Sequence, residues 1–491
     1  HFLLKEIEEA PKSFRKTLRG KIVTGDDGLV QVALGPDTLP DAVRRDLVSG
    51  AIDRVLVIGQ GTAAVAGQSL ARILATQLAA TPVRVQALPA TELSGFSLRH
   101  DMADTLVVAI SQSGTTTDTN RTVDLVRSRG ARVIAIVNRR SSDLTDKSDG
   151  VLYTSDGRDV EMSVASTKAF YSQIAAGFLL AAAIAQEVIP GGEGAAERSA
   201  LLTGLREIPA AMEATLARRP VIAEAARELC PPRRYWAIVG SGSNRIAAEE
   251  IRIKLSELCY KAIACDATED KKHIDLSSEP LILVCAAGLV GSNADDVAKE
   301  VAIYRAHKAT PVVIATEDED RFSGALRVLT VPSVRHELAF VLSTVVGHLF
   351  GYEAALAIDA QALPLREARG AIEDAVSGPL GEDADRLFTT LRPVFEPIAA
   401  RFNDGLRSGA YNGHLEAGTA VRLASVFRYA TGVVPLDAYQ VELGRVGTPG
   451  GVIEDLTHAL TGAIEELTRP VDAIKHQAKT VTVGISRSDE S

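Results

Sequence analysis

The residues best suited to binding an anion form a short polar segment, residues 111–119, with five hydroxyl side chains within 111–117 and one glycine, Gly114. An apolar run at 105–110 precedes this segment and predicts a buried parallel strand, and residues 123–127 predict a helix. A turn between a strand and a helix offers unpaired N–H groups and a positive dipole end, which favour an anion. The segment contains no lysine, so we expect a small phosphorylated metabolite rather than a nucleotide. The alternative is an ordinary Ser/Thr helix cap.

A second group of residues could move protons. Lys254 and Glu257 are three positions apart in residues 247–260, which have a helical pattern, so they share one face with Glu250. A carboxylate beside an ammonium group can act as a base next to a cation that stabilises an oxyanion. The alternative is an ion pair on a solvated helix surface. His273, in a polar stretch after two lysines, could give and take a proton near neutral pH.

The composition excludes several classes of protein. The chain has 491 residues, of which 46% are hydrophobic and only 4% aromatic, so we expect about three domains with aliphatic cores. Its net charge of −10 argues against nucleic acid or an anionic membrane as partner. The apolar run at 174–185 is shorter than the roughly 20 residues of a membrane span. The four cysteines lack the spacing of a zinc site, and we expect them to be reduced in a cytoplasmic protein.

Strand and helix patterns alternate over the first 360 residues, which predicts an α/β fold with parallel sheets. Four strands are expected in the first lobe, at 55–58, 105–110, 133–137 and 151–154. Residues 57–62 resemble residues 238–243, and residues 135–137 resemble residues 313–315, so the offsets are 181 and 178. These similar offsets indicate a duplication. In the second lobe, residues 283–288 take the place of the polar turn but carry no hydroxyl, so we expect the phosphate in the first lobe.

The remainder of the chain has a helical pattern, clearest at 385–395 and 452–464. We therefore expect five parts: a linker segment (1–24), a phosphate-binding lobe (25–194), a lobe with catalytic residues (195–360), a helical insertion (361–470), and a C-terminal loop and tail (471–491).

Five segments, in this order, resemble the isomerase half of the glutamine–fructose-6-phosphate aminotransferases (glucosamine-6-phosphate synthases): residues 1–11, 111–119, 164–170, 254–273 and 471–483. That half consists of two SIS (sugar isomerase) domains, so the resemblance implies tandem SIS domains with flavodoxin-like sheets. In this family the chain passes almost directly from the second domain to the C-terminal lysine loop, so residues 361–470 are an insertion. Residues 367–370 are a poorer match to that loop than residues 477–482.

The resemblance implies a role for each candidate residue. Glu257 would be the base, Lys254 the cation for an enediolate, Glu250 an assisting group, His273 the ring-opening group of a neighbouring subunit, and Lys479 a Schiff-base amine. The expected substrate-binding residues are Thr62, Ser111, Gln112, Ser113, Thr116, Val164, Ser166 and Ala478. Relatives usually carry a serine where this chain has Ala63, which bears on the identity of the sugar.

The resemblance also implies partners. The substrate would be fructose 6-phosphate or a related sugar phosphate, and the active protein would be at least a homodimer. Ammonia would come from an N-terminal glutaminase domain, which this chain lacks, so we expect a piece of a longer protein. No metal or organic cofactor is expected. Two alternatives remain: an amino-sugar-phosphate deaminase or deglycase, and a non-catalytic sugar-phosphate sensor or scaffold.

Overall fold

The first lobe contains a five-stranded parallel sheet. The computed structural model describes residues 1–378 and 383–474. The strands of the first sheet are β3 (Arg54–Gly59), β4 (Arg84–Pro89), β5 (Thr105–Ser111), β6 (Arg132–Val137) and β7 (Gly150–Tyr153), in the order β4-β3-β5-β6-β7. The four predicted strands are therefore confirmed. The sequence analysis missed β4, because this edge strand is only partly buried and lacks the continuous apolar run of the central strands.

The second lobe repeats this sheet. Its strands are β8 (Trp236–Gly240), β9 (Ala264–Asp266), β10 (Leu281–Cys285), β11 (Thr310–Thr316) and β12 (Arg327–Val331), in the order β12-β11-β10-β8-β9. When the strands of each lobe are numbered from one, both sheets have the order 2-1-3-4-5, and all neighbouring strands are parallel. This is the flavodoxin-like order, so the predicted fold class and duplication are confirmed.

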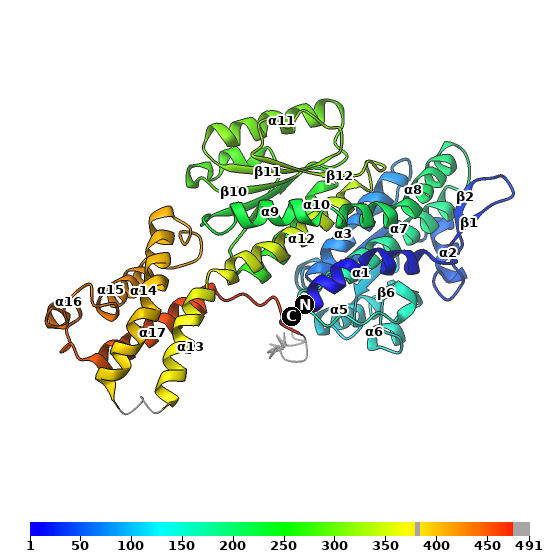
Figure 1. Ribbon diagram of the computed structural model, residues 1–491. Coiled ribbons are helices and arrows are strands. Elements are labelled where there is room, and N and C mark those ends of the chain that lie inside the picture. Colours follow the sequence, from blue (N-terminus) through cyan, green and yellow to red (C-terminus); the bar gives the residue numbers. More distant parts are fainter. Residues whose placement is uncertain (379–382, 475–491) are drawn as a thin grey trace.

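Helices cover both faces of each sheet (Figure 1). In the first lobe these are α1 (Phe2–Leu18), α2 (Asp41–Ser49), α3 (Thr62–Gln77), α5 (Thr117–Arg127), α6 (Asp143–Asp146) and α7 (Lys168–Val188). In the second lobe they are α8 (Glu193–Leu216), α9 (Arg219–Leu229), α10 (Asn244–Cys259), α11 (Gly291–Ala306) and α12 (Ala339–Ala360). Between α1 and α2, β1 (Ile22–Thr24) and β2 (Val30–Val32) form a small antiparallel hairpin. The core is continuous between the lobes, because α3, α7, α10 and α12 share one apolar cluster.

Two helices are long and apolar enough to cross a membrane. Helix α7 has 21 residues and α12 has 22, with mean hydropathies of 1.4 and 1.5. The sequence analysis treated the apolar run inside α7 as too short, and the length of this helix corrects that view. In both helices 89% of the most apolar window is buried inside the protein, so packing between the two lobes accounts for their composition.

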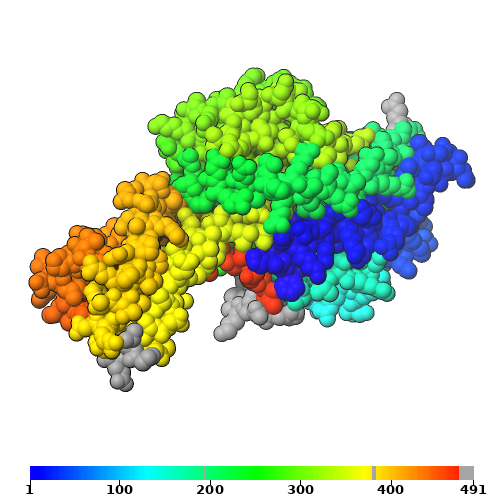
Figure 2. Space-filling view, viewed as in Figure 1, coloured from blue at the N-terminus to red at the C-terminus, as the bar shows by residue number. Residues whose placement is uncertain are grey.

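The residues after α12 form a helical bundle with its own core. It consists of α13 (Leu363–Ser377), α14 (Ala384–Ser408), α15 (Ala417–Ala430), α16 (Tyr439–Leu443) and α17 (Pro449–Leu467), and it projects from the two lobes (Figure 2). The bundle touches the second lobe where the ring of His414 packs against Trp236, with centroids 5.9 Å apart. After α17 the chain returns to the first lobe, where Oδ1 of Asp472 lies 3.2 Å from Nε2 of His1.

Candidate functional site

The hydroxyl groups of the polar turn after β5 form hydrogen bonds within the turn and do not cap α5. The Oγ atom of Ser111 accepts a hydrogen bond from the backbone N–H of Gly114 at 3.0 Å and lies 3.2 Å from Oγ1 of Thr116. Gly114 has φ +68°, a left-handed conformation that a side chain would strain. Thr116 is the N-cap residue of α5, yet its side chain makes no capping hydrogen bond. The turn is therefore more than an ordinary helix cap, because its hydroxyls are not used to close the helix.

This turn forms one wall of a cavity of about 230 Å³. The opposite wall belongs to the second lobe, since α10 contributes Lys254 and Glu257. The predicted residues that line the cavity are Thr62, Ser111, Gln112, Ser113, Thr116, Val164, Ser166, Lys254 and Glu257. Ala63 lines it too. The fold thus places hydroxyl donors and a lysine–glutamate pair around one small polar space.

Lys254 and Glu257 form a close ion pair at the cavity wall. The Nζ atom of Lys254 lies 2.9 Å from Oε2 of Glu257 and 4.0 Å from Oε1 of Glu250. The Lys254 side chain is only 2% exposed, whereas that of Glu257 is 45% exposed. Burial disfavours the charged amine, but the two carboxylates outweigh it and raise the pKa of Lys254. Lys254 is therefore a fixed cation, and Glu257 is the more accessible carboxylate.

Glu250 lies behind this pair and does not line the cavity. Its carboxylate is fully buried, with Oε1 3.3 Å from Nε2 of His348 and 3.4 Å from Oγ1 of Thr62. Nδ1 of His348 in turn lies 2.8 Å from the hydroxyl of Tyr171. Burial lowers the pKa of His348, although Glu250 opposes this shift. Glu250 thus links Lys254 to a buried polar network, and the sequence analysis missed His348 and Tyr171.

Two glutamines of the cavity were also missed. Gln60 follows β3, and Gln173 lies in α7. Gln173 is 3% exposed, and its Oε1 accepts no hydrogen bond from any residue in the described parts of the chain. A signal was present, because a glutamine inside an otherwise apolar helix needs a polar partner.

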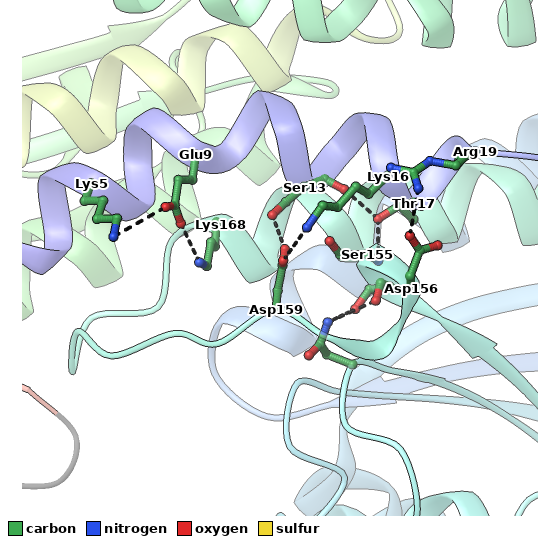
Figure 3. Close-up of polar contacts among 12 residues, drawn as sticks. Lys5, Glu9, Ser13, Lys16, Thr17, Arg19, Ser155, Asp156, Asp159 and Lys168 are labelled. Carbon is green, nitrogen blue, oxygen red and sulfur yellow. Dashed lines mark hydrogen bonds and ion pairs between the residues drawn. The ribbon is translucent and has the colours of Figure 1, made fainter.

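Helix α1 holds the loop that carries Val164 and Ser166 (Figure 3). Lys168, at the end of this loop, forms an ion pair with Glu9 at 2.8 Å, and Lys16 contacts Asp159 at 3.3 Å. Within the loop, Ser166 donates a hydrogen bond to Glu161 at 2.7 Å. These contacts fix the loop against the cavity.

Besides Glu250, one predicted residue of the described segments, His273, does not line the cavity. His273 is exposed, in a short 3-10 helix (Asp270–His273) of the second lobe. Ala478 and Lys479 lie outside the described residues. The last described residue, Ile474, forms an antiparallel bridge with Ser163, and the N–H of Val164 donates to the carbonyl of Ala473 at 3.1 Å.

Two further features bear on the alternatives considered above. Residues 367–370 lie within α13, where Arg369 pairs with Glu373 at 3.2 Å, and none of them lines the cavity. Within residues 1–378 and 383–474, no three His, Cys, Asp or Glu side chains are grouped as a metal site would require.

Residues 51–183 match the SIS domain family. This region of the chain therefore contains a SIS domain. Among curated relatives, the glutamine–fructose-6-phosphate aminotransferase of Symbiobacterium thermophilum is 33% identical to this chain over 361 residues. The alignment covers 73% of this chain and 56% of the relative. The enzyme of the same name from Streptomyces coelicolor is 33% identical over 364 residues, covering 72% and 56%. This chain therefore spans a little over half the length of these relatives.

A solved structure supports the same fold. The C-terminal domain of glucosamine-fructose-6-phosphate aminotransferase from Francisella tularensis aligns with a TM-score of 0.62 at 21% identity and covers 73% of this chain and 96% of that domain. The match leaves about a quarter of this chain uncovered.

Proposed function

We propose that the chain catalyses the sugar-phosphate half of glucosamine 6-phosphate synthesis. Fructose 6-phosphate would be its substrate, and ammonia from glutamine, hydrolysed by a separate glutaminase domain, would supply the nitrogen. The observation that carries the proposal is the meeting of two lobes at one cavity. Hydroxyls of the first lobe suit a phosphate, and Lys254 and Glu257 of the second lobe suit proton transfer. The curated aminotransferases related to the chain support this choice of reaction.

In the proposed isomerisation, the phosphate lies at Ser111, Ser113 and Thr116, which fixes the position of the open-chain sugar. Glu257 removes a proton from C1 and returns it to C2, while the hydroxyl proton on O1 moves to O2, so that the carbonyl passes from C2 to C1. Negative charge develops on the sugar oxygen in the transition state, and the buried ammonium of Lys254 stabilises it at low cost in reorganisation. Glu250 assists by holding Lys254 in place, since the two groups lie 4.0 Å apart.

For amination, we propose that Lys479 forms a Schiff base with the C2 carbonyl of fructose 6-phosphate and releases water. Ammonia then displaces the Lys479 amine and leaves an imine at C2. Transfer of a proton from C1 to C2 by Glu257, and of the O1 hydroxyl proton to the nitrogen, gives the C2 amine and the C1 aldehyde. The support is the path of the chain, since the bridge between Ile474 and Ser163 lies beside the cavity residue Val164. Five extended residues span about 17 Å, so a lysine five positions further on is within reach of the cavity. Ala478 would contact the sugar beside it.

We further propose that His273 opens the sugar ring in the cavity of a neighbouring subunit, so that the active form is at least a homodimer. Its exposure on the second lobe supports this role.

A cytoplasmic location fits the four free cysteines. We retain 25–194 and 195–360 as the limits of the SIS domains and 361–470 as those of the insertion. The bundle's separate core supports the insertion limits.

The proposal is tested by measuring products with the full chain. Fructose 6-phosphate should yield glucose 6-phosphate in a coupled assay, and glucosamine 6-phosphate when ammonium chloride is added. Release of ammonia from glucosamine 6-phosphate, without the forward reaction, would instead identify a deaminase. Saturable binding of fructose 6-phosphate without any product would identify a sensor. The absence of both binding and turnover would overturn the proposal.

A further inference from the structure

Gln173 is a buried polar side chain in the wall of the catalytic cavity, the one that Lys254 and Glu257 line. It lies in the second turn of α7 and is 3% exposed. Its Oε1 atom accepts no hydrogen bond from the described parts of the chain. A buried amide oxygen without a partner costs free energy, which a bound molecule with a suitable donor would recover. The cavity therefore contains an acceptor that the protein itself does not use.

The packing of two helices fixes the position of this amide. Gly177, one turn further along α7, lies against α3, because a Cβ on this glycine would lie 3.1 Å from Cβ of Leu70. Residues four positions apart share one face of a helix, so Gln173 faces α3 as well. The first turn of α3 carries Thr62 and Ala63, and both line the same cavity. A pair of packed helices, and not a loop, therefore holds Gln173 at the cavity.

Other polar side chains of the cavity differ from Gln173, because they already have protein partners. Gln60 donates a hydrogen bond to Oγ1 of Thr91 at 3.3 Å, and Ser166 donates one to Glu161 at 2.7 Å. Gln60 and Gln173 both line the cavity, and the contacts of Gln60 show that the fold can pair such an amide with the protein. In Gln173, by contrast, the side-chain oxygen is left for the ligand.

The chemistry of an amide oxygen restricts which group of a ligand can pair with it. This oxygen only accepts hydrogen bonds, so a phosphate dianion or the C2 carbonyl of the sugar, which also only accept, would leave it unpaired. A hydroxyl group can donate to it. In the reaction proposed above, C1 and C2 lie at Glu257 and Lys254, and the phosphate lies at the turn after β5. The secondary hydroxyls at C3 to C5 of the sugar chain are therefore the donors that remain.

We infer that Gln173 accepts a hydrogen bond from one of these secondary hydroxyls, so that the cavity selects a sugar phosphate with an intact polyhydroxyl chain. This inference rests on the proposed function, because it requires a sugar phosphate in the cavity. A site that bonds a hydroxyl rejects the analogue without it, since the buried polar group of the protein is then left unpaired. Selection among sugars thus belongs to α7 of the first lobe, and proton transfer to α10 of the second.

The test compares the full wild-type chain with Gln173→Met, which keeps the length of the side chain but removes the acceptor. The probe is sorbitol 6-phosphate, which carries the hydroxyls at C3 to C5 but cannot isomerise because it has no carbonyl. In calorimetric titrations the variant should bind this probe about 10-fold more weakly. Without a ligand, the variant should have a higher melting temperature, because the buried unpaired amide is gone. A purely structural role would give a lower melting temperature and an unchanged Kd.

Gln186→Met is the matched control in the same helix. Both amide atoms of Gln186 are paired with the backbone of Val32, at 3.4 Å each, and Gln186 does not line the cavity. This variant should therefore lower the melting temperature and leave the Kd of sorbitol 6-phosphate unchanged, which is the opposite of the result expected for Gln173→Met.

A second measurement changes the ligand instead of the protein. The 3-, 4- and 5-deoxy forms of sorbitol 6-phosphate each lack one hydroxyl, and the wild-type chain should bind at least one of them about 10-fold more weakly than the parent compound. Gln173→Met should bind that deoxy form as tightly as the parent compound, because the two changes remove the same contact. The inference is overturned if every deoxy form loses as much affinity with Gln173→Met as with the wild-type chain.

Turnover of fructose 6-phosphate, measured in parallel, separates this inference from the proposed function. Weaker binding by Gln173→Met, together with no turnover by the wild-type chain, would overturn the proposed reaction and support the inference. Turnover together with equal binding of all probes by the wild-type chain and Gln173→Met would overturn the inference alone. Failure of the wild-type chain to bind sorbitol 6-phosphate would overturn the inference, and the absence of turnover as well would overturn both.

Discussion

The turns after β5 and β10 each contain a glycine in the left-handed conformation, but their other side chains differ. An offset of 174 pairs Gly114 with Gly288 (114 + 174), and their φ angles are +68° and +73°. Around these glycines the first lobe has Ser111, Gln112, Ser113, Thr115 and Thr116, and the second has Cys285, Ala286, Ala287, Leu289 and Val290. The left-handed glycine is thus common to both lobes and does not depend on the ligand. The ability to hold a phosphate depends on the other side chains of the turn.

The largest expected effect concerns proton transfer, which we assign to the second lobe. Glu257→Gln should lower kcat for conversion of fructose 6-phosphate by roughly 10²–10⁴-fold, because the amide cannot accept a proton. KM should change little, since the phosphate is held by the other lobe. Steady-state kinetics measure both values. Glu224→Gln, at an exposed position of α9, is the control, and equal kcat values for the two variants would contradict the assignment.

A matched pair of glycine variants tests the two turns directly. A Cβ on Gly114 would lie 2.0 Å from Oγ of Ser142, and one on Gly288 would lie 2.5 Å from Cβ of Ala339, so alanine should strain both turns. Both variants should therefore lower the melting temperature. Only Gly114→Ala should also raise KM for fructose 6-phosphate, by about 10-fold or more. A similar rise in KM for Gly288→Ala would show that the turns do not differ in function.

Removing a single hydroxyl should have a smaller effect. Ser113→Ala takes away one donor to the phosphate, and hydrogen bonds to charged groups contribute about 1.5–3 kcal/mol, so KM should rise by at least about 10-fold with kcat nearly unchanged. Ser292→Ala, at the exposed start of α11 in the second lobe, is the control and should leave KM as it is. An unchanged KM for Ser113→Ala would place the phosphate elsewhere.

The smallest effect is expected for Ala63→Ser, which adds a hydroxyl to the wall of the catalytic cavity. If the substrate is fructose 6-phosphate, the added hydroxyl should lower KM by a few-fold, in line with about 1 kcal/mol for one net hydrogen bond. Kinetics with fructose 6-phosphate and with a panel of other sugar phosphates would measure this. A higher KM for fructose 6-phosphate together with better use of another sugar would indicate that Ala63 makes room for that sugar.

Much of the fold could be predicted from local patterns. The central strands are continuous apolar runs, and the helices of the bundle have regular apolar spacing, so both were found. The edge strand β4 was missed because it is only partly buried. The full length of α7 was underestimated because its first residues include Lys168, Ser172 and Gln173 and its last turn includes Gln186 and Glu187. Burial that depends on a neighbouring element leaves no local pattern.

The candidate site divides in the same way. The sequence by itself determined the chemistry of the turn at 111–119 and the shared helix face of Lys254 and Glu257, because both depend on residues close together in the chain. Only the tertiary structure decided that these groups, about 140 positions apart, line one cavity. It also decided that Gln173 and His348 belong to the site and its surroundings. The reason is physical: the packing of α3 and α10 at the contact between the lobes sets these distances, and a one-dimensional pattern does not record which buried faces meet.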